Sequence, residues 1–150
     1  MLDQVKNNEI IKKLPYSPPF LFVDRILELD ENHIIGEYTY KKKEFFYKGH
    51  FSGNPVTPGV ILLETMGQIG LVCFGLYLMD IKDKNGWTPL LANLVSDFYQ
   101  IIKPETKVIV RAEKIYFRRN ILKANIIMTT ENKSKIASST AVCNFIYSQK

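Results

Sequence analysis

The segment from Pro58 to Met79 most constrains the fold of this chain, because it reads as a helix that is apolar on nearly every face. It contains one charged residue, Glu64. A helix with this pattern has to be surrounded by other apolar groups. Its length would also suffice to span a bilayer, which takes about 20 residues. Glu64, Gln68, four glycines and the lack of a basic cluster at either flank nevertheless favour a buried core helix.

Alternating patterns typical of β-strands precede and follow this helix. Residues 26–29 and 34–40 are expected to form a hairpin, after a short helix over residues 3–13. Four further strands are expected to run as a meander, over residues 90–102, 107–117, 121–130 and 135–147. One sheet wrapped around one helix is the economical way to bury that helix. The sequence therefore predicts one α+β domain over residues 1–150, with an antiparallel sheet wrapped around a single long central helix.

The net charge and the cysteines indicate which kinds of partner and which cellular compartment to expect. A net charge of +5 favours acidic partners, among which nucleic acid, phospholipid and acidic protein stay open. Cys73 and Cys143 lie in apolar surroundings without a metal-binding spacing, so we expect buried free thiols in a reducing compartment. The polar stretch from Met1 to Lys13 lacks the apolar core of a secretory signal. These features predict a cytoplasmic protein.

The loop before the long helix brings a titratable side chain close to a helix start. His50 lies in this Gly- and Pro-rich loop and is the natural candidate for a general base. Thr57 and Pro58 form a helix-start signal, with Thr57 as the expected N-cap. The N–H of Gly59 then has no partner within the helix, and no side chain blocks the approach of a ligand carbonyl. Gly59 is therefore a candidate oxyanion donor.

Glu64 and Gln68 follow on one face of the expected helix. They are one turn apart, so the Gln68 amide is placed to orient the Glu64 carboxyl group. A carboxyl group in apolar surroundings binds its proton tightly, which suits it to act as a general acid near neutral pH. A base, an acid and an oxyanion donor fit two reactions. These are removal of a proton α to a carbonyl with loss of a β-leaving group, and hydrolysis of a thioester by activated water.

Two motifs resemble those of a known family. Residues 49–60 read Gly-His-Phe-x-Gly-x-Pro-Val-x-Pro-Gly-Val, and residues 64–68 read Glu-x-Met-x-Gln. Residues 14–25, Leu-Pro-Tyr-Ser-Pro-Pro-Phe-Leu-Phe-Val-Asp-Arg, are similar to a second stretch of that family. The family is that of the (3R)-hydroxyacyl-acyl-carrier-protein dehydratases of bacterial fatty-acid synthesis, the FabZ type. The resemblance covers essentially the whole chain.

The resemblance implies a hot-dog fold that pairs into homodimers, often three dimers to a hexamer. It implies a hydro-lyase without a metal or organic cofactor. Such an enzyme forms trans-2-enoyl-acyl-carrier-protein in fatty-acid or related polyene- and polyketide-like biosynthesis. The family's catalytic His matches His50 and its catalytic Glu matches Glu64, and the two act from different subunits across the dimer interface. The N–H matching Gly59 holds the thioester carbonyl. A related branch that also isomerises the double bond has Asp in place of Glu64, so the dehydratase-only branch is favoured.

Further residues are candidates for the substrate path. Phe20, Phe98 and Tyr99 would line or gate an acyl tunnel, or belong to the plain core. Three positions depart from the family's usual residues, and they fit a specialised acyl substrate: Tyr16 in place of His, Ser52 in place of Pro and Thr57 in place of Met.

The acyl carrier protein expected as partner is strongly acidic, which offers a reason for the positive net charge. Basic residues would supply a docking face that acts mainly on the association rate. A solvated sheet edge is the alternative for each of them. The candidates are Lys103, Lys107, Arg111, Lys114, Arg118, Arg119 and Lys123.

Two other functions stay open from the sequence. A thioesterase on the same fold would use Glu64 to activate water, and a non-catalytic module would bind acyl carrier protein without chemistry. The presence of both His50 and Glu64 weighs against the second. The basic residues form no recognisable nucleic-acid-binding motif, so we expect no nucleic-acid role.

Overall fold

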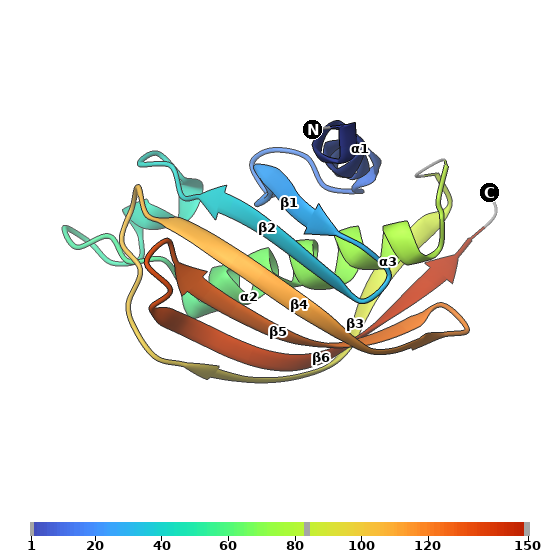
Figure 1. Cartoon of the computed structure of the whole chain (residues 1–150). Helices are drawn as coiled ribbons and strands as arrows, with labels where there is room; N and C mark the ends of the chain where they lie inside the picture. Colours follow the sequence, from blue (N-terminus) through green and yellow to red (C-terminus); the bar gives the residue numbers. More distant parts are fainter. Residues whose placement is uncertain (1, 83–84, 149–150) are drawn as a thin grey trace.

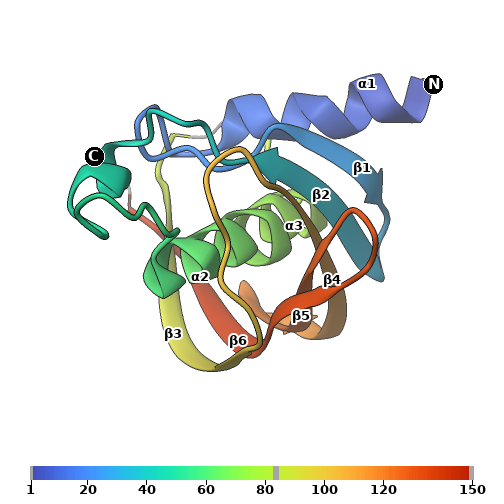
Figure 2. The same cartoon turned by 90° about the vertical axis from the view of Figure 1, so that its left-hand side faces the viewer.

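The computed structural model describes residues 2–82 and 85–148. It shows one antiparallel sheet curled around one long helix, as the sequence predicts (Figures 1 and 2). The expected single domain of residues 1–150 includes residues 1, 83–84 and 149–150, which lie outside the described residues. The six strands are β1 (Arg25–Leu29), β2 (His33–Thr39), β3 (Trp87–Phe98), β4 (Lys107–Arg118), β5 (Ile121–Thr130) and β6 (Lys135–Tyr147).

The long helix has three consecutive parts: α2 (Gly59–Gly67), a π-helical part η3 (Gln68–Cys73) and α3 (Phe74–Leu78). Met66, Ile69 and Phe74 on it are at most 1% exposed. The inward positions of β4 meet this surface, because Val108, Val110 and Ala112 are fully buried, whereas the residues between them are not. The alternation read from the sequence is therefore the alternation between the helix side and the outer side of the sheet.

The chain N-terminal to the sheet packs beside its first strand. The helix α1 (Leu2–Glu9) continues into a 3₁₀ turn, η1 (Ile10–Lys13), and lies next to β1 (Figure 1). Ile10 and Leu14 are buried, and the Asn8 side chain accepts a hydrogen bond from the Ile26 N–H. A second 3₁₀ turn, η2 (Phe45–Lys48), leads into the loop before α2.

The predicted four-strand meander is wrong for β3. The strand order is β1-β2-β4-β5-β6-β3, so β3 pairs with β6 and not with β4. The reason is that β2 occupies the edge of β4, from the pair His33–Glu113 to the pair Thr39–Lys107. The free edge of β6 is the position left for β3, and residues 99–106 then return to the start of β4.

β3 forms one edge of the sheet and carries exposed apolar side chains. It pairs with β6 from Trp87–Tyr147 to Phe98–Ala137, and within the described chain its other edge has no strand beside it. The residues from β3 to the following loop that are large, apolar and about half exposed or more are Leu90, Leu91, Val95, Phe98, Tyr99 and Ile101. A long apolar edge strand of this kind is a surface on which another chain can pair.

The helix Gly59–Leu78 is long and apolar enough to cross a membrane, but 72% of its most hydrophobic window is buried inside the protein. The sheet covers it, as expected for the core helix of a globular fold. No membrane span is indicated.

Two glycines of the long helix provide a matched test of this packing. A Cβ at Gly75 would lie 2.1 and 2.3 Å from carbons of the buried Phe145 ring, whereas a Cβ at Gly67 would meet nothing within 4 Å. We expect Gly75→Ala to lower the free energy of unfolding by about 1–3 kcal/mol through overpacking. Gly67→Ala should raise it by about 0.5–1 kcal/mol through helix propensity. Urea unfolding measures both, and equal effects would contradict the packing described.

Candidate active site

Gln68 joins the long helix to the segment that crosses it. Its side chain is fully buried, and its Nε2 donates to the Glu64 Oε1 and to the Phe20 carbonyl oxygen, both at 3.0 Å. Its Oε1 accepts a 2.8 Å hydrogen bond from the Phe22 N–H. The amide of Gln68 thus fixes the carboxylate of Glu64 relative to residues 20–22, in agreement with the orienting role expected from their spacing.

Glu64 faces a largely apolar cavity of about 270 Å³. The long helix contributes one wall, and Pro89, Leu91 and Leu94 of β3 contribute another. The lining residues with polar or ionisable side chains are Glu64, Tyr16, Ser139 and Cys143. The remaining lining residues come from the helix and from β5: Val60, Leu63, Met66, Gly67, Leu71, Val72 and Ile126.

His50 is held by its own loop and does not line this cavity. Its Nδ1 lies 2.8 Å from the Val56 carbonyl oxygen, an acceptor, so Nδ1 carries the proton and donates it. The Phe51 ring stacks on the imidazole at 3.9 Å between centroids. Since Nδ1–H is engaged, Nε2 is the nitrogen that presents a lone pair to a substrate. The loop contacts therefore orient the imidazole and leave Nε2 free to accept a proton, but His50 does not line the Glu64 cavity of its own chain.

The start of the helix differs from the expected N-cap. Pro58 is the N-cap and no side chain caps the helix. The buried Thr57 hydroxyl lies instead 2.6 Å from the Tyr47 hydroxyl. The Gly59 N–H has no acceptor among the described residues, as expected for a first helical N–H. The Phe98 ring lies over Gly59, since a Cβ there would be 3.3 Å from its Cζ.

The three aromatic candidates occupy different places. Phe98 covers Gly59, and Phe20 lies beside Gln68 through its carbonyl oxygen. The Tyr99 hydroxyl lies 2.9 Å from the Ser138 Oγ, at the end of β3. Each is 40–52% exposed, and none of the three lines the Glu64 cavity. Of the three, it is Phe98 that is in contact with a candidate site residue through its ring.

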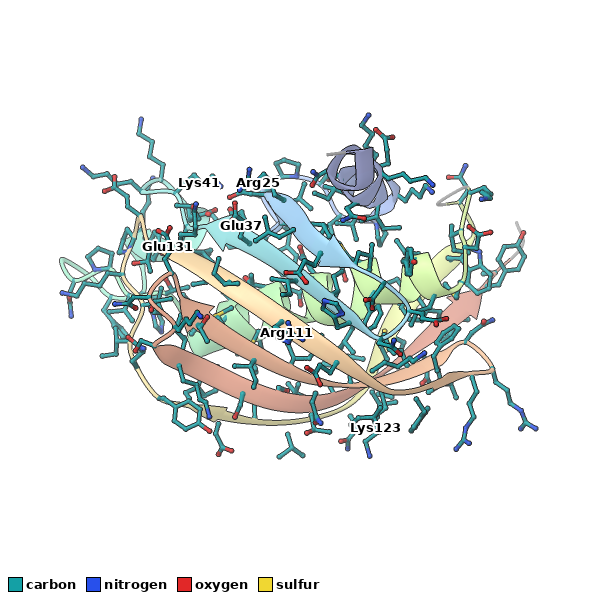
Figure 3. The ribbon with its side chains drawn as sticks, viewed as in Figure 1. Arg25, Glu37, Lys41, Arg111, Lys123 and Glu131 are labelled. Carbon is teal, nitrogen blue, oxygen red and sulfur yellow. The ribbon has the colours of Figure 1, made fainter. Side chains whose placement is uncertain are left out.

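The basic candidates are distributed along the sheet. β4 runs from Lys107 to Arg118 with an irregularity between Lys114 and Tyr116, and an extended strand of this length spans about 36 Å at roughly 3.3 Å per residue. Lys107 lies 3.8 Å from Glu37 and 3.9 Å from Glu131, and Arg111 pairs with Glu113 at 3.1 Å. Figure 3 shows Arg111 near the middle of β4 and Lys123 well apart from it.

Lys103 is the basic candidate nearest to the helix start. It is exposed, and the carbonyl of the neighbouring Ile102 accepts a 2.8 Å hydrogen bond from the Thr57 N–H. Arg118 and Arg119 lie at the β4–β5 turn, at the far end of β4. Lys114 and Lys123 are partly buried near that end. The seven residues therefore do not form one patch, and Lys103 follows the residue that is bonded to Thr57, just before the start of the long helix.

Tyr16 and Cys143 in the cavity were not identified as site residues from the sequence. Burial raises the pKa of Tyr16 above its usual range, and the charge of Glu64 adds to the effect. Burial also raises the pKa of Cys143 to about 12, and that of Cys73 above its usual range. Both cysteines are buried free thiols, as predicted, and both stay protonated. Tyr16 lies in the upstream motif, which was the available signal.

The described residues do not form a metal-binding site. No group of three or more His, Cys, Asp or Glu side chains there is arranged to hold a metal ion. Residues 2–82 and 85–148 thus offer the acid–base groups and the helix N–H described above as candidates for chemistry.

Comparison with known structures defines the fold class first. A dehydratase heterocomplex from Xenorhabdus doucetiae matches with a TM-score of 0.74 at 10% identity, over 94% of this chain and 91% of that chain. A hypothetical thioesterase from Streptococcus pneumoniae, solved with coenzyme A, matches with a TM-score of 0.62 at 13% identity, over 84% and 87%. One helix wrapped by one antiparallel sheet is the hot-dog fold, and these similarities show that fold.

The sequence comparisons identify the family. A family model described as a FabA-like domain matches residues 14–139, and the chain belongs to that family. The 3-hydroxyacyl-[acyl-carrier-protein] dehydratase FabZ of Fusobacterium nucleatum is 39% identical over 121 residues, which cover 77% of this chain and 80% of the relative. The matched residues include the Glu64–Gln68 network, the loop of His50 and the crossing segment from residue 14 onward.

The Gln68 network predicts a specific stability loss. In Gln68→Leu the buried Phe22 N–H loses its acceptor, and the carboxylate of Glu64 loses its donor. We expect the free energy of unfolding to fall by about 1–3 kcal/mol. The control is Gln100→Leu, because Gln100 is exposed and donates to Ser134 and Lys135 at the surface. Denaturant unfolding that gives the same change for both variants would contradict the structural role assigned to Gln68.

Proposed function

We propose that this protein is a 3-hydroxyacyl-acyl-carrier-protein dehydratase that works in fatty-acid or related acyl-chain biosynthesis. The observation that carries the proposal is the Glu64 carboxylate, held by the buried Gln68 amide at an apolar cavity, in a chain of the FabA-like family. Relatives named as FabZ dehydratases are 32–39% identical over most of the chain, which supports the same reaction here.

The reaction follows from the chemistry of the site. A (3R)-hydroxyacyl thioester enters with its carbonyl oxygen at the Gly59 N–H, at the positive end of the helix dipole. His50 removes a proton from C2 through Nε2. Glu64 gives a proton to the C3 hydroxyl, which leaves as water, and the product is the trans-2-enoyl thioester. The two protons balance, because His50 gains one and Glu64 loses one, and exchange with water restores both groups. This chemistry does not call for a cofactor.

A homodimer completes the site in this proposal. His50 does not line the cavity of Glu64 in its own chain, and β3 carries an apolar free edge next to that cavity. Antiparallel pairing of two β3 strands about a two-fold axis would cover the edge and bring a second chain to each cavity. His50 of one subunit then acts with Glu64 of the other. Association of three such dimers into a hexamer stays a prediction from the resemblance.

Acyl carrier protein is the partner that delivers the substrate. Its acidic surface suits a chain of net charge +5, and Lys103 is the candidate docking residue near the start of the long helix. The cytoplasmic location stays a prediction from the free thiols and the N-terminal sequence.

The catalytic assignment predicts that His50→Ala and Glu64→Gln each abolish dehydration. Each removes one proton-transfer group, which is worth about 10²- to 10⁴-fold in rate. The assay follows enoyl product and free thiol separately on a 3-hydroxyacyl-carrier substrate. Enoyl product without thiol is expected from the wild type, whereas thiol release would establish a thioesterase. Near-wild-type dehydration by either variant would contradict the assignment.

Mixing the two inactive variants tests the shared site. After joint unfolding and refolding, we expect about one quarter of the wild-type rate, because about half of the dimers are mixed and each mixed dimer has one complete site. Wild type refolded in parallel provides the reference. If His50 and Glu64 of the same subunit acted together, the mixture would stay inactive.

Charge reversal at Lys103, in the loop before β4, and at Arg118, at the end of β4, tests the docking face. We expect Lys103→Glu to raise the KM for a carrier-linked substrate by about three- to tenfold at low salt, with little change at high salt. Turnover of the same acyl group on a small thiol should stay unchanged. Arg118→Glu is the matched control at the far end of the strand, and an equal effect of Arg118→Glu would contradict docking near the start of the long helix.

A further inference from the structure

Tyr16 lines the cavity of Glu64. It is one of the few residues with a polar side chain around a space of about 270 Å³, which corresponds to about nine volumes of roughly 30 Å³, the share of one water molecule. The Ser139 hydroxyl is committed elsewhere, since it donates to the Val95 carbonyl at 3.1 Å. Within the described part of the chain, the Tyr16 hydroxyl has no hydrogen-bond partner.

The phenol of Tyr16 remains a hydrogen-bond donor at any physiological pH. Burial, followed by the charge of Glu64, raises its pKa, so the hydroxyl keeps its proton. Leu71 and Val72 of the helix, about two turns beyond Glu64, and Cys143 of β6 line the same cavity as Tyr16. No hydrogen bond joins the Tyr16 hydroxyl to the Glu64 carboxylate. Tyr16 therefore lines a cavity that extends past Glu64, into a space that an acyl chain would fill beyond its reacting carbons.

The backbone around Tyr16 is fixed, so the position of the hydroxyl is a property of the fold. Leu14 and Phe22, on either side, are 2% and 0% exposed. The Gln68 amide binds the backbone at residues 20 and 22. Pro15, Pro18 and Pro19 restrict the chain between these anchors. A hydroxyl that is already in position needs little reorganisation to bind an acceptor on the substrate. A hydrocarbon chain would instead leave the hydroxyl buried without a hydrogen bond.

We propose that Tyr16 is a specificity-determining residue: its hydroxyl donates a hydrogen bond to an oxygen on the acyl chain beyond C3, so that the cavity selects oxygenated 3-hydroxyacyl thioesters over fully saturated ones. This inference rests on the proposed dehydratase function and adds the substrate class. The proton transfers at C2 and C3 stay with His50 and Glu64, and Tyr16 neither gains nor loses a proton.

The test compares carrier-linked 3-hydroxyacyl thioesters of equal length, one with an all-methylene chain and three with a single ketone at C5, C7 or C9. For the wild type we expect kcat/KM to be about tenfold higher for one ketone substrate than for the saturated one. Tyr16→Phe removes one oxygen atom and should abolish this preference, mainly by lowering kcat/KM on the ketone substrate. The loss should fall on the ketone substrate, and circular dichroism and the denaturation midpoint show separately that the variant is folded.

The control is Tyr77→Phe, because Tyr77 lies on α3 outside the Glu64 cavity. It should leave the preference unchanged. Wild type that dehydrates all substrates equally, or Tyr16→Phe that keeps the preference, would overturn the proposal while the dehydratase function stands. An equal loss on all substrates in Tyr16→Phe would overturn it too, because the hydroxyl would then act on atoms shared by all of them. Wild type that dehydrates none of them would overturn the proposed function itself, and this inference with it.

Discussion

The side-chain amide of Gln68 has to be satisfied inside a helix that is otherwise apolar, and this requirement fixes the geometry of the site. Burying an amide without hydrogen-bond partners would cost free energy. Both the Nε2 and the Oε1 of Gln68 have partners, which lie outside the helix or one turn away along it. The Nε2 binds Glu64 and the Phe20 carbonyl, and the Oε1 binds the Phe22 N–H. One residue thus orients the acid, anchors the crossing segment and thereby places Tyr16. A change at Gln68 would therefore disturb all three together.

The long helix imposes a second condition, because its apolar surface is larger than one curved sheet can cover. The sheet encloses the side bearing Met66, Ile69 and Phe74, but Val60 at the helix start stays 72% exposed. The cavity of Glu64 opens beside the same uncovered region, next to the free edge of β3. The exposed apolar surface and the Glu64 cavity therefore lie side by side. In the proposed homodimer, a second chain would both cover this surface and bring its His50 to the cavity.

The elements that could be predicted from the sequence are those governed by local pattern. The helix, the hairpin and the strand alternation of Val108, Val110 and Ala112 follow from periodicity, and the spacing of Glu64 and Gln68 gives their contact. The place of β3 could not be read in this way, because which sheet edge is free depends on β2, far away in sequence. The bond of Thr57 to Tyr47, in place of a cap, likewise depends on a buried partner from another segment. The path of the crossing segment brings Tyr16 to the cavity of Glu64, and no residue spacing along the chain predicts that path.

The polarity of the cavity bears on the choice between dehydration and hydrolysis. A hydrolytic water needs two to four polar partners to be held in place. The cavity offers the Glu64 carboxylate, a thiol that stays protonated, and the hydroxyls of Tyr16 and Ser139, the second of which is bonded to Val95. Dehydration needs no bound water at the start, since the leaving hydroxyl arrives on the substrate and takes its proton from Glu64. A second chain over the β3 edge would exclude water further, and an acyl chain beside Tyr16 would fill the remaining space. The apolar walls therefore offer few partners to the water that a thioesterase would require.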